Sequence, residues 1–251
     1  MDKTNFFTLR LDVFSFEGAM QKIESILKNQ QTRLLFFINA HCFNIAQKNQ
    51  SYKKSLLEAD LVFNDGVGID LAARIGGVKL KANLNGTDLI PAIIELAGKI
   101  NKNIYLLGGK PGIADKAKIQ VEKKFPVLQI KGVHSGYFDE KEENRIIEEI
   151  NLLNIDLLVV GMGVPRQELW LLRNKDKFNN LKLGVAGGAI IDFLSGNISR
   201  APVWMRRSKI EWIYRLWLEP RRMWQRYMIG NIVFFWHILR LKKEHKLNQK
   251  K

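Results

Sequence analysis

The sequence predicts an α/β fold in which helices cover both faces of a parallel β-sheet. Short apolar runs alternate about six times with segments whose apolar residues recur at helical spacing. The run from Leu34 to Ile38 is continuously apolar, which is typical of a strand buried on both faces. Polar or glycine-rich turns follow the runs directly, and crossovers between parallel strands are right-handed. These features predict a Rossmann-like sheet over residues 1–198.

The first half of this domain has clear starts and stops. Ser15 is placed to cap a helix, and Gly76-Gly77 breaks the helix that follows Gly68. The stretch from Val78 to Asn85 has no clear period and is expected to be a loop. In chain order we expect a strand at 6–11, a helix at 15–29, a strand at 34–38, a helix after His41, a helix at 52–59, a strand at 61–63 and a helix after Gly68.

The second half repeats the alternation of strands and helices. Pro91 lies in a segment of helical period and is compatible only with the first turn of that helix. We expect helices at 86–99, 111–125 and 140–153, and strands at 104–107, 127–133 and 156–160 that alternate with them. A helix from 165, a strand at 181–186 and a short helix through 194 are expected to follow.

Residues 199–251 differ from the rest and are predicted to form a helical appendage. They carry a net charge of +11, whereas residues 1–198 carry +4. Five of the six tryptophans also lie there. We expect two or three helices there, one from Val203 to Leu218 and a second that enters at Pro220 and can continue to Leu241. The uneven charge predicts an anionic partner for this appendage.

Asp65 is the candidate general base. The apolar run Leu61-Val62-Phe63 ends at Asn64-Asp65-Gly66, which places Asp65 beyond the carboxyl end of a buried strand. A carboxylate in that position can take a proton from a substrate hydroxyl. From this stretch alone, a simple turn is the plainer interpretation, because Asn and Asp both tolerate turn geometry.

Three glycine-rich turns are expected at the same edge of the sheet. Glycine allows the backbone to approach a ligand, and helix N-termini present free N–H groups to phosphate. The turns predict a nucleotide or sugar-nucleotide ligand, although each glycine alone is equally explained by a tight turn. None matches the dinucleotide fingerprint or the Walker pattern. The turns are Gly108-Gly109, Gly161 to Gly163 and Gly187-Gly188.

Several kinds of site are not supported by the spacing of residues. The four histidines are scattered and the single cysteine, Cys42, has no cysteine partner, so no zinc site and no internal disulfide are expected. No G-x-S-x-G nucleophile elbow is present. Cys42 is interpreted as a small buried hydrophobic residue. No metal and no cofactor are predicted.

The appendage admits three interpretations, which we favour in the order given. Its tryptophans and arginines suit a helix lying on an anionic membrane surface. They also suit a hairpin packed on the domain with its tryptophans buried, or a site for single-stranded nucleic acid. The N-terminus lacks the pattern of a signal peptide, and no apolar run of about 18 residues predicts a spanning helix.

Seven motifs in the same order resemble the WecG/TagA/CpsF glycosyltransferase family. They cover nearly the whole chain. The motifs are Phe63-Asn64-Asp65-Gly66, Gly86-Thr87-Asp88-Leu89, Leu106-Leu107-Gly108-Gly109-Lys110-Pro111-Gly112, Gly132-x-His134-x-Gly136-Tyr137-Phe138, Gly161-x-Gly163-x-Pro165-x-Gln167-Glu168-x-Trp170, Arg200-Ala201-Pro202 and Glu211-Trp212-x-Tyr214-Arg215-Leu216-x-x-Glu219-Pro220-Arg221-Arg222.

The resemblance implies an inverting, metal-independent transfer of a sugar from a UDP-sugar to a lipid-diphosphate-linked sugar. Members act at the cytoplasmic face of the plasma membrane as peripheral proteins, in the synthesis of cell-surface polysaccharides. The implied donor is UDP-N-acetylmannosamine or its uronic acid. Two residues depart from the family near the expected sugar site: Phe37 replaces a threonine, and Asn83 replaces a frequent arginine. The sequence therefore does not identify the donor sugar. It also does not give the oligomeric state, for which a homo-oligomer is one alternative.

The resemblance also implies roles for individual residues. Asp65 matches the proposed base, and Gln167 matches a conserved glutamine with a catalytic role. Substrate-binding positions are expected at Asn39, Asn64, Gly66, Asp88, Gly108, Gly109, Tyr137, Gly161, Gly163 and Asp192. Arginines expected to bind UDP or the lipid diphosphate are Arg200, Arg215, Arg221, Arg222 and Arg226.

Two other functional classes remain as alternatives at this point. A nucleotide-dependent oxidoreductase would bind NAD(P), but the missing dinucleotide fingerprint argues against it. A nucleic-acid-binding protein would bind oligonucleotides with steep salt dependence and without lipid. We expect no nucleic acid partner, and we expect an anionic membrane surface instead.

Overall fold

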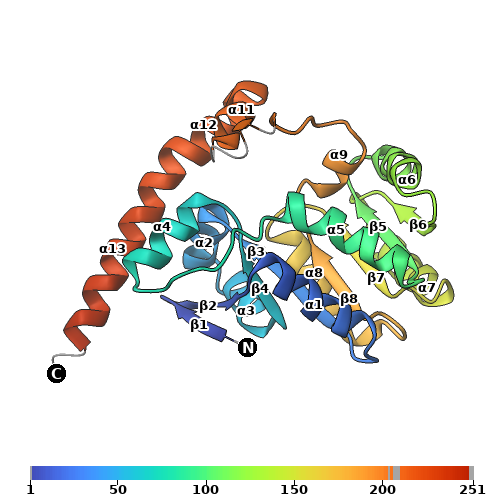
Figure 1. The fold of residues 1–251 in the computed structure, drawn as a ribbon, viewed down its shortest axis with the longest axis horizontal. Helices are drawn as coiled ribbons and strands as arrows, with labels where there is room; N and C mark the ends of the chain where they lie inside the picture. Colours follow the sequence, from blue (N-terminus) through green and yellow to red (C-terminus); the bar gives the residue numbers. More distant parts are fainter. Residues whose placement is uncertain (1, 203, 206–209, 249–251) are drawn as a thin grey trace.

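A computed structural model describes residues 2–202, 204–205 and 210–248 of the chain. Its described residues contain a six-stranded, fully parallel sheet with the strand order β4-β3-β8-β7-β5-β6 (Figure 1). The prediction of an α/β fold with a parallel sheet is therefore confirmed. The strands are β3 (Arg33–Ile38), β4 (Leu61–Asn64), β5 (Ile104–Gly108), β6 (Ile130–His134), β7 (Leu157–Gly161) and β8 (Leu183–Ala186).

Helices cover both faces of the sheet because alternate residues of each strand face opposite layers. In β3, Leu34, Phe36 and Ile38 join one core cluster, whereas Leu35 and Phe37 join the other. The second cluster includes α1 (Phe16–Leu27), α5 (Gly86–Lys99), α6 (Ile113–Lys124) and α9 (Ile190–Leu194). The first includes α2 (Ala40–Lys48), α3 (Gln50–Glu58), α4 (Val67–Ile75), α7 (Glu140–Leu152) and α8 (Arg166–Asn174), which continues into the 3₁₀ turn η1 (Lys175–Lys177).

The prediction of a single strand at residues 6–11 is wrong. The chain forms an antiparallel hairpin there, made of β1 (Asp2–Phe6) and β2 (Leu9–Val13). Phe7 stands in the turn with a φ of 54°. No glycine, asparagine or aspartate marks this reversal, and a phenylalanine in the left-handed region is rare, so the sequence gives no local signal for it.

Pro91 is the second departure. It is the sixth residue of α5 rather than a first-turn residue, because the helix begins at Gly86 after the cap residue Asn85. Proline donates no hydrogen bond, so the carbonyl of Thr87 loses its usual donor four residues along the helix. The helix continues to Lys99 with one face buried in the core.

The C-terminal segment is helical, as expected, with different bounds. Its described helices are α11 (Glu211–Leu218), α12 (Pro220–Trp224), the π-helix η2 (Gln225–Ile229) and α13 (Gly230–Asn248). The first helix was expected from Val203, which lies outside the described residues, as do residues 206–209. The second was expected to end at Leu241, but α13 extends to Asn248.

One face of α13 is packed on the α/β body. Figure 1 shows α13 running as a long rod beside α4 and α2. Phe234 and Ile238 are fully buried, and the ring of Phe234 meets that of Phe43 in α2 edge to face, with centroids 5.3 Å apart. Asn44 Nδ2 donates to the carbonyl of Gly230 at 2.7 Å. The segment is therefore docked rather than loosely tethered.

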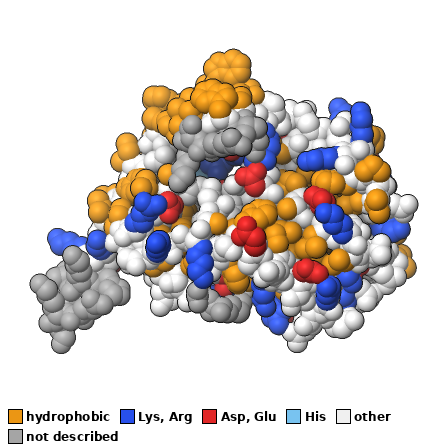
Figure 2. Space-filling model, viewed as in Figure 1, with side chains coloured by type: hydrophobic (Ala, Val, Ile, Leu, Met, Phe, Trp, Pro, Cys, Tyr) orange, Lys and Arg blue, Asp and Glu red, His pale blue; other side chains and the backbone are white. Residues whose placement is uncertain are grey.

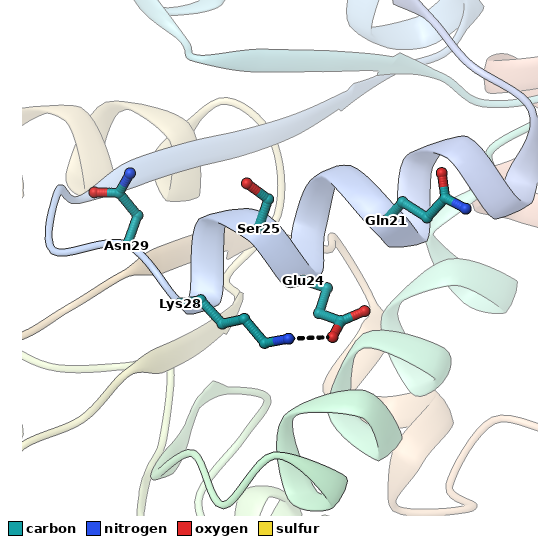
Figure 3. A pocket seen from close by; sticks show the side chains of 5 residues that line it. All are labelled: Gln21, Glu24, Ser25, Lys28 and Asn29. Carbon is teal, nitrogen blue, oxygen red and sulfur yellow. Dashed lines mark hydrogen bonds and ion pairs between the residues drawn. The ribbon is translucent and has the colours of Figure 1, made fainter.

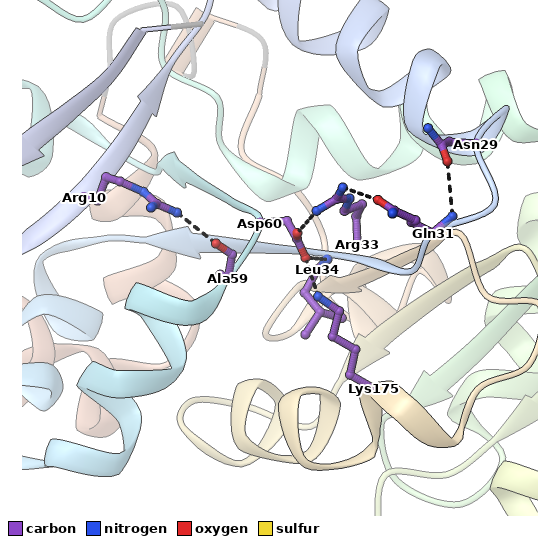
Figure 4. Close-up of polar contacts among 8 residues, drawn as sticks. All are labelled: Arg10, Asn29, Gln31, Arg33, Leu34, Ala59, Asp60 and Lys175. Atoms are coloured by element: carbon purple, nitrogen blue, oxygen red, sulfur yellow. Dashed lines mark hydrogen bonds and ion pairs between the residues drawn. The ribbon is translucent and has the colours of Figure 1, made fainter.

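Asp60 joins three elements at the amino ends of the strands (Figure 4). Its carboxylate accepts hydrogen bonds from Arg33 at 2.6 Å, from Lys175 at 2.8 Å and from the N–H of Leu34 at 2.9 Å. Burial alone would raise the pKa of Asp60, but the bonds from Lys175, Arg33 and Leu34 outweigh it and hold the pKa below its usual value. The ionised carboxylate thus connects β3, the start of β4 and η1.

We expect Asp60→Asn to lower the free energy of unfolding at neutral pH by about 1–3 kcal/mol, because charge-assisted hydrogen bonds are lost. The depressed pKa places this stabilisation above the unfolded pKa of about 4, and it disappears as the pH falls through the lower folded pKa. Urea unfolding of wild type and variant at about pH 7 and at about pH 3 measures both effects.

Glu148→Gln is the matched control, because Glu148 is exposed on α7. It should change stability by less than about 0.5 kcal/mol. Equal stability of Asp60→Asn and wild type at neutral pH would contradict the structural role of Asp60.

Candidate active site

The carboxyl ends of the strands lie along one edge of the sheet because every strand is parallel to its neighbours. The register pairs Ile38 with Asn64 and Gly108 with Gly161. Asn39, Asp65 and the glycine-rich turns therefore follow the strands at the same edge. The sequence predicted this edge from the order of strands and turns.

The turn that carries Asp65 is held on both sides. The N–H of Asp65 donates to the carbonyl of Ile38 at 2.8 Å, and Asp65 Oδ2 accepts from Asn39 Nδ2 at 3.3 Å. Gly66 adopts a φ of 94°, and its N–H donates to Asn83 Oδ1 at 2.8 Å. These bonds fix the direction of the carboxylate.

Asn39 and Asn64 hold this turn to neighbouring elements. Asn39 Oδ1 accepts from the N–H of Cys42 at 3.1 Å and so caps α2. Asn64 is 2% exposed, and its Nδ2 donates to the carbonyl of Ala82 at 2.9 Å. The two asparagines are thus occupied by structural hydrogen bonds, and Asn39 also contacts the candidate base.

Burial raises the pKa of Asp65. The charge of Arg215, the hydrogen bond from Asn39 and the charge of Arg226 oppose the rise, while Glu211 adds to it. The carboxylate is therefore more basic than a solvent-exposed one. A base is most effective when its pKa lies closer to the working pH.

The C-terminal segment brings two arginines to this edge. Arg215 in α11 is half-buried, forms an ion pair with Glu211 at 3.2 Å and lies over the ring of Phe193, 4.9 Å from its centroid. Arg226 in η2 acts on Asp65 and on His41. Burial and then the charge of Arg226 lower the pKa of His41 to about 4. His41 is therefore uncharged at neutral pH.

Arg200 lies in the connection between the α/β body and the C-terminal helices. Its guanidinium pairs with Asp88 at 2.8 Å and donates to Thr87 Oγ1 at 3.4 Å. Asn85 Oδ1 accepts from the N–H of Asp88 at 2.9 Å and caps α5. The sequence grouped Arg200 with the phosphate-binding arginines, and the structure places it on the N-terminus of α5.

The glycines of β5 and β7 meet at a topological switch point. The chain leaves β5 towards β6 through α6, and leaves β7 towards β8 through α8 on the opposite face. Ligands of open α/β sheets bind at such points. Gly108 has a φ of 153°, and a Cβ there would lie 2.4 Å from the carbonyl oxygen of Gly161, so no larger residue fits.

Other predicted site residues are spread around this edge. Tyr137 is 62% exposed after β6, Gly163 has a φ of 79°, and Asp192 is half-buried on α9. Arg221 is exposed and lines a surface hollow of ≈ 540 Å³ together with Leu216, Pro220, Trp224 and Gln225. The side chain of Arg222 lies outside the described part of the structure.

Gln167, for which the resemblance implies a catalytic role, is 2% exposed, and that role stays a prediction. Its Nε2 donates to Glu168 at 2.7 Å, and its Oε1 accepts from the N–H of Gly188 at 2.9 Å. Both ends of the amide are used inside the protein. The structure therefore places Gln167 behind a glycine-rich turn of the site.

Parts of this arrangement escaped prediction. Phe193 under Arg215 left no recognisable motif. Asn83 was noted only as a departure from the family pattern, and its hydrogen bond with the N–H of Gly66 was not foreseen. Glu211 stands four residues before Arg215, a spacing that predicts an ion pair on one helix face.

The tryptophans of the C-terminal segment are exposed. The interpretation as a hairpin packed on the domain is therefore right about the packing of α13 and wrong about the burial of the tryptophans. Figure 2 shows hydrophobic side chains gathered over the end of the molecule formed by α11 and α12. The helices bury Met223, Phe234 and Ile238 instead. The exposed fractions are 63% for Trp204, 39% for Trp212, 76% for Trp217, 57% for Trp224 and 55% for Trp236.

A second hollow lies on the outer surface of α1 and is lined by Gln21, Glu24, Ser25, Lys28 and Asn29 (Figure 3). An ion pair of 2.6 Å between Lys28 and Glu24 crosses it. None of the residues of the carboxyl edge lines it, so it is not part of this site.

Two further features concern the described residues only. Among residues 2–202, 204–205 and 210–248, no three or more His, Cys, Asp or Glu side chains are grouped to hold a metal ion. Within the same ranges, every helix is too short or too polar to cross a bilayer.

Comparison with known proteins gives consistent matches. The model of the glycosyl transferase WecG/TagA/CpsF family matches residues 4–248. Curated relatives from Staphylococcus aureus strains NCTC 8325 / PS 47, COL and MSSA476 are 27% identical to this chain over 229 residues, which is 90% of this chain and 88% of each relative. Each is named N-acetylglucosaminyldiphosphoundecaprenol N-acetyl-beta-D-mannosaminyltransferase.

The position of Arg226 predicts a change in the titration of His41. Arg226→Gln removes a nearby positive charge, so the pKa of His41 should rise above about 4 while staying below its ordinary value, because burial remains. Histidine NMR titration of the full chain measures this pKa.

Arg221→Gln is the control, since Arg221 is exposed on the preceding helix. That substitution should leave His41 unchanged. If Arg226→Gln also left the titration of His41 unchanged, Arg226 would not lie at the carboxyl edge.

Proposed function

The chain belongs to the WecG/TagA/CpsF glycosyltransferase family, and on that premise we propose that it transfers a hexosamine from a UDP-sugar to a sugar on a polyprenyl diphosphate. The best candidate for the donor sugar is N-acetylmannosamine, by analogy with the names of the relatives, and its uronic acid is the second candidate, from the family resemblance. Family membership makes the chain a sugar-transferring enzyme, so the oxidoreductase alternative is set aside. The placement of Asp65 among Asn39, Arg215 and Arg226 is the observation that carries the proposal for this chain.

The proposed reaction is a single displacement at the anomeric carbon. Asp65 accepts the proton of the acceptor hydroxyl while that oxygen forms a bond to the anomeric carbon. The bond from the same carbon to the phosphate oxygen breaks, and its electron pair leaves with UDP. Attack from the face opposite UDP inverts the configuration. The raised pKa of Asp65 supports its role as proton acceptor.

Charge on the departing UDP needs stabilisation. We place the diphosphate near the switch point of β5 and β7, where Gly109 and its neighbours allow close approach of the backbone. Arg215 and Arg226 supply positive charge from the C-terminal segment. Metal independence is part of this proposal, and unchanged turnover in excess EDTA is its direct test.

The two departures from the family pattern affect the donor sugar. Phe37 is 7% exposed and packs against Phe63, with ring centroids 6.2 Å apart. Asn83 is used in a hydrogen bond to Gly66. A panel of UDP-sugars with a lipid-diphosphate-linked N-acetylglucosamine acceptor, scored by UDP release, identifies the donor. Absence of UDP release with every sugar would refute the proposed function.

Asp65→Asn tests the base directly. The substitution keeps the size of the side chain and removes its basicity, so turnover should fall by about 10² to 10⁴ while UDP still binds. UDP release and calorimetric titration with UDP measure the two quantities. Asp176→Asn, an exposed change on η1, is the control and should retain wild-type turnover. Wild-type turnover by Asp65→Asn would refute the assignment.

We further propose that the C-terminal segment holds the enzyme on an anionic membrane surface, at the cytoplasmic face. Its net charge of +11 suits anionic headgroups, and its exposed tryptophans suit the interface. The acceptor in this proposal carries a lipid, so its sugar is presented at that surface. The same segment carries Arg215 and Arg226, which links attachment to the site.

Liposome flotation of the full chain with Trp217→Ser or Trp224→Ser tests the attachment. Each substitution removes a large apolar side chain from the interface and should weaken binding to anionic vesicles by about tenfold. Point substitutions are preferred to truncation because Phe234 and Ile238 belong to the core.

Leu152→Ser is the control, since Leu152 is 80% exposed on α7 and outside the segment. It should float like wild type. Unchanged flotation of both tryptophan variants would contradict the membrane role. Salt-steep binding of oligonucleotides without lipid would favour the nucleic-acid alternative.

A further inference from the structure

Two buried neighbours on α8 form one hydrogen-bonded unit. Gln167 and Glu168 are 2% and 1% exposed. Gln167 Nε2 donates to Glu168 Oε1 at 2.7 Å, which leaves Gln167 Oε1 to accept from the N–H of Gly188 at 2.9 Å. If the amide were reversed, its NH₂ group would face the N–H of Gly188. Glu168 therefore determines which end of Gln167 reaches the turn.

The turn held by Gln167 lies at the centre of the candidate site. Gly188 adopts a φ of 63°, and the N–H of Gly187 donates to the carbonyl of Val160 at 2.8 Å. A Cβ on Gly161 would lie 3.0 Å from the carbonyl oxygen of Gly188, so the turn packs directly on β7. A shift of this turn would move the glycines of the switch point.

The same turn leads into α9, which supports an arginine of the site. Phe193 on α9 lies under the guanidinium of Arg215, 4.9 Å from its ring centroid. A displacement of the turn after β8 would thus move the backbone of the switch point on one side, and on the other side it would move Phe193, which supports Arg215. Gln167 is the side chain that holds this turn from behind.

We propose that Glu168 is a positioning residue that acts as an uncharged carboxyl group, orienting Gln167 so that the Gly187-Gly188 turn stays in its catalytic arrangement. This proposal rests on the proposed function and adds a residue to it. Nothing in the family match assigns a role to Glu168. Glu168 does not touch the reacting atoms in this account. It acts through Gln167.

The surroundings of Glu168 favour its neutral form. Burial raises the pKa of Glu168 to about 7, although the hydrogen bond from Gln167 lowers it in part. Its Oε2 is buried and has no hydrogen-bond partner among the described residues. An unpartnered oxygen is tolerated far better on a neutral carboxyl than on a buried carboxylate.

The titratable groups near Glu168 come from α2 and α3. Burial, and after it the charge of Glu168, raise the pKa of Cys42 to about 11. Burial also raises the pKa of Tyr52, to which Cys42 and Glu168 add. Both groups are uncharged at neutral pH and become anions when they ionise, so neither compensates a negative charge on Glu168 in either state.

The raised pKa fixes the sign of the pH dependence. Stability linked to Glu168 is fully present below its unfolded pKa of about 4.3 and is lost as the pH rises through about 7. Ionisation places an uncompensated charge beside Gln167 and loosens the turn. Turnover of the wild type should therefore decline as the pH rises from about 6.5 to about 8.5.

The test compares Glu168→Gln and Glu168→Leu in the full chain, by UDP release and by calorimetric titration with UDP. Glutamine keeps an oxygen that accepts from Gln167 and cannot ionise, so Glu168→Gln should retain turnover near pH 6.5 and lose the alkaline decline. Leucine removes the acceptor, so kcat per folded molecule should fall by about 10²-fold, as expected for a misplaced site, with a smaller change in KM.

Glu143→Gln is the matched control, because Glu143 is a buried carboxylate on α7 that pairs with Arg173 away from this turn. It should lower the melting temperature and leave kcat and its pH profile unchanged. If Glu168→Leu does not fold, Glu168→Gln alone decides the question through its pH profile.

Three outcomes separate the claims. Loss of the alkaline decline in Glu168→Gln supports the positioning role. An unchanged decline in Glu168→Gln, or wild-type kcat in a folded Glu168→Leu, overturns it. A wild-type enzyme that releases no UDP from any UDP-sugar would instead defeat the proposed function itself.

Discussion

The packing of α13 on α2 is the contact on which the candidate site depends. Phe234 fits edge to face against Phe43, and Asn44 binds the carbonyl of Gly230 at the start of α13. Burial of such a ring stabilises a contact by about 1.5–3 kcal/mol. The same helix α2 begins at Asn39, which contacts Asp65. One rigid element therefore holds both the acid and the segment that carries Arg226.

This arrangement balances opposing effects on Asp65. Burial favours the protonated acid, whereas Arg215, Asn39 and Arg226 favour the carboxylate. Glu211 pairs with Arg215 and reduces its effect on Asp65. A base must be ionised to accept a proton, yet a carboxylate stabilised too strongly by arginines is a weak base. The half-buried position of Asp65, beside an Arg215 that Glu211 partly neutralises, satisfies both requirements.

The sequence predicted what depends on local pattern and on topology. Continuous apolar runs gave the strands, and their parallel order placed Asn39, Asp65 and the glycines at one edge. The turn at Phe7 could not be predicted, because no residue with a preference for positive φ marks it. The burial of Gln167 and the pairing of Arg200 with Asp88 join segments that are distant in the chain, and such contacts leave no periodic signal. Packing of the C-terminal segment on the domain was one of three interpretations, but the residues that make the contact, Phe43 and Phe234, escaped prediction for the same reason.

In this structure the C-terminal segment delivers positive charge to Asp65 through Arg215 and Arg226. The most direct measurement is a carbon-13 NMR titration of the Asp65 carboxyl group in the full chain, in wild type and in Arg215→Gln, with Arg240→Gln, a change at an exposed residue of α13, as the control. The account predicts a higher pKa for Asp65 in Arg215→Gln and no change in Arg240→Gln, because Arg215 leads the effects that oppose burial. An identical titration of Asp65 in wild type and Arg215→Gln would contradict it.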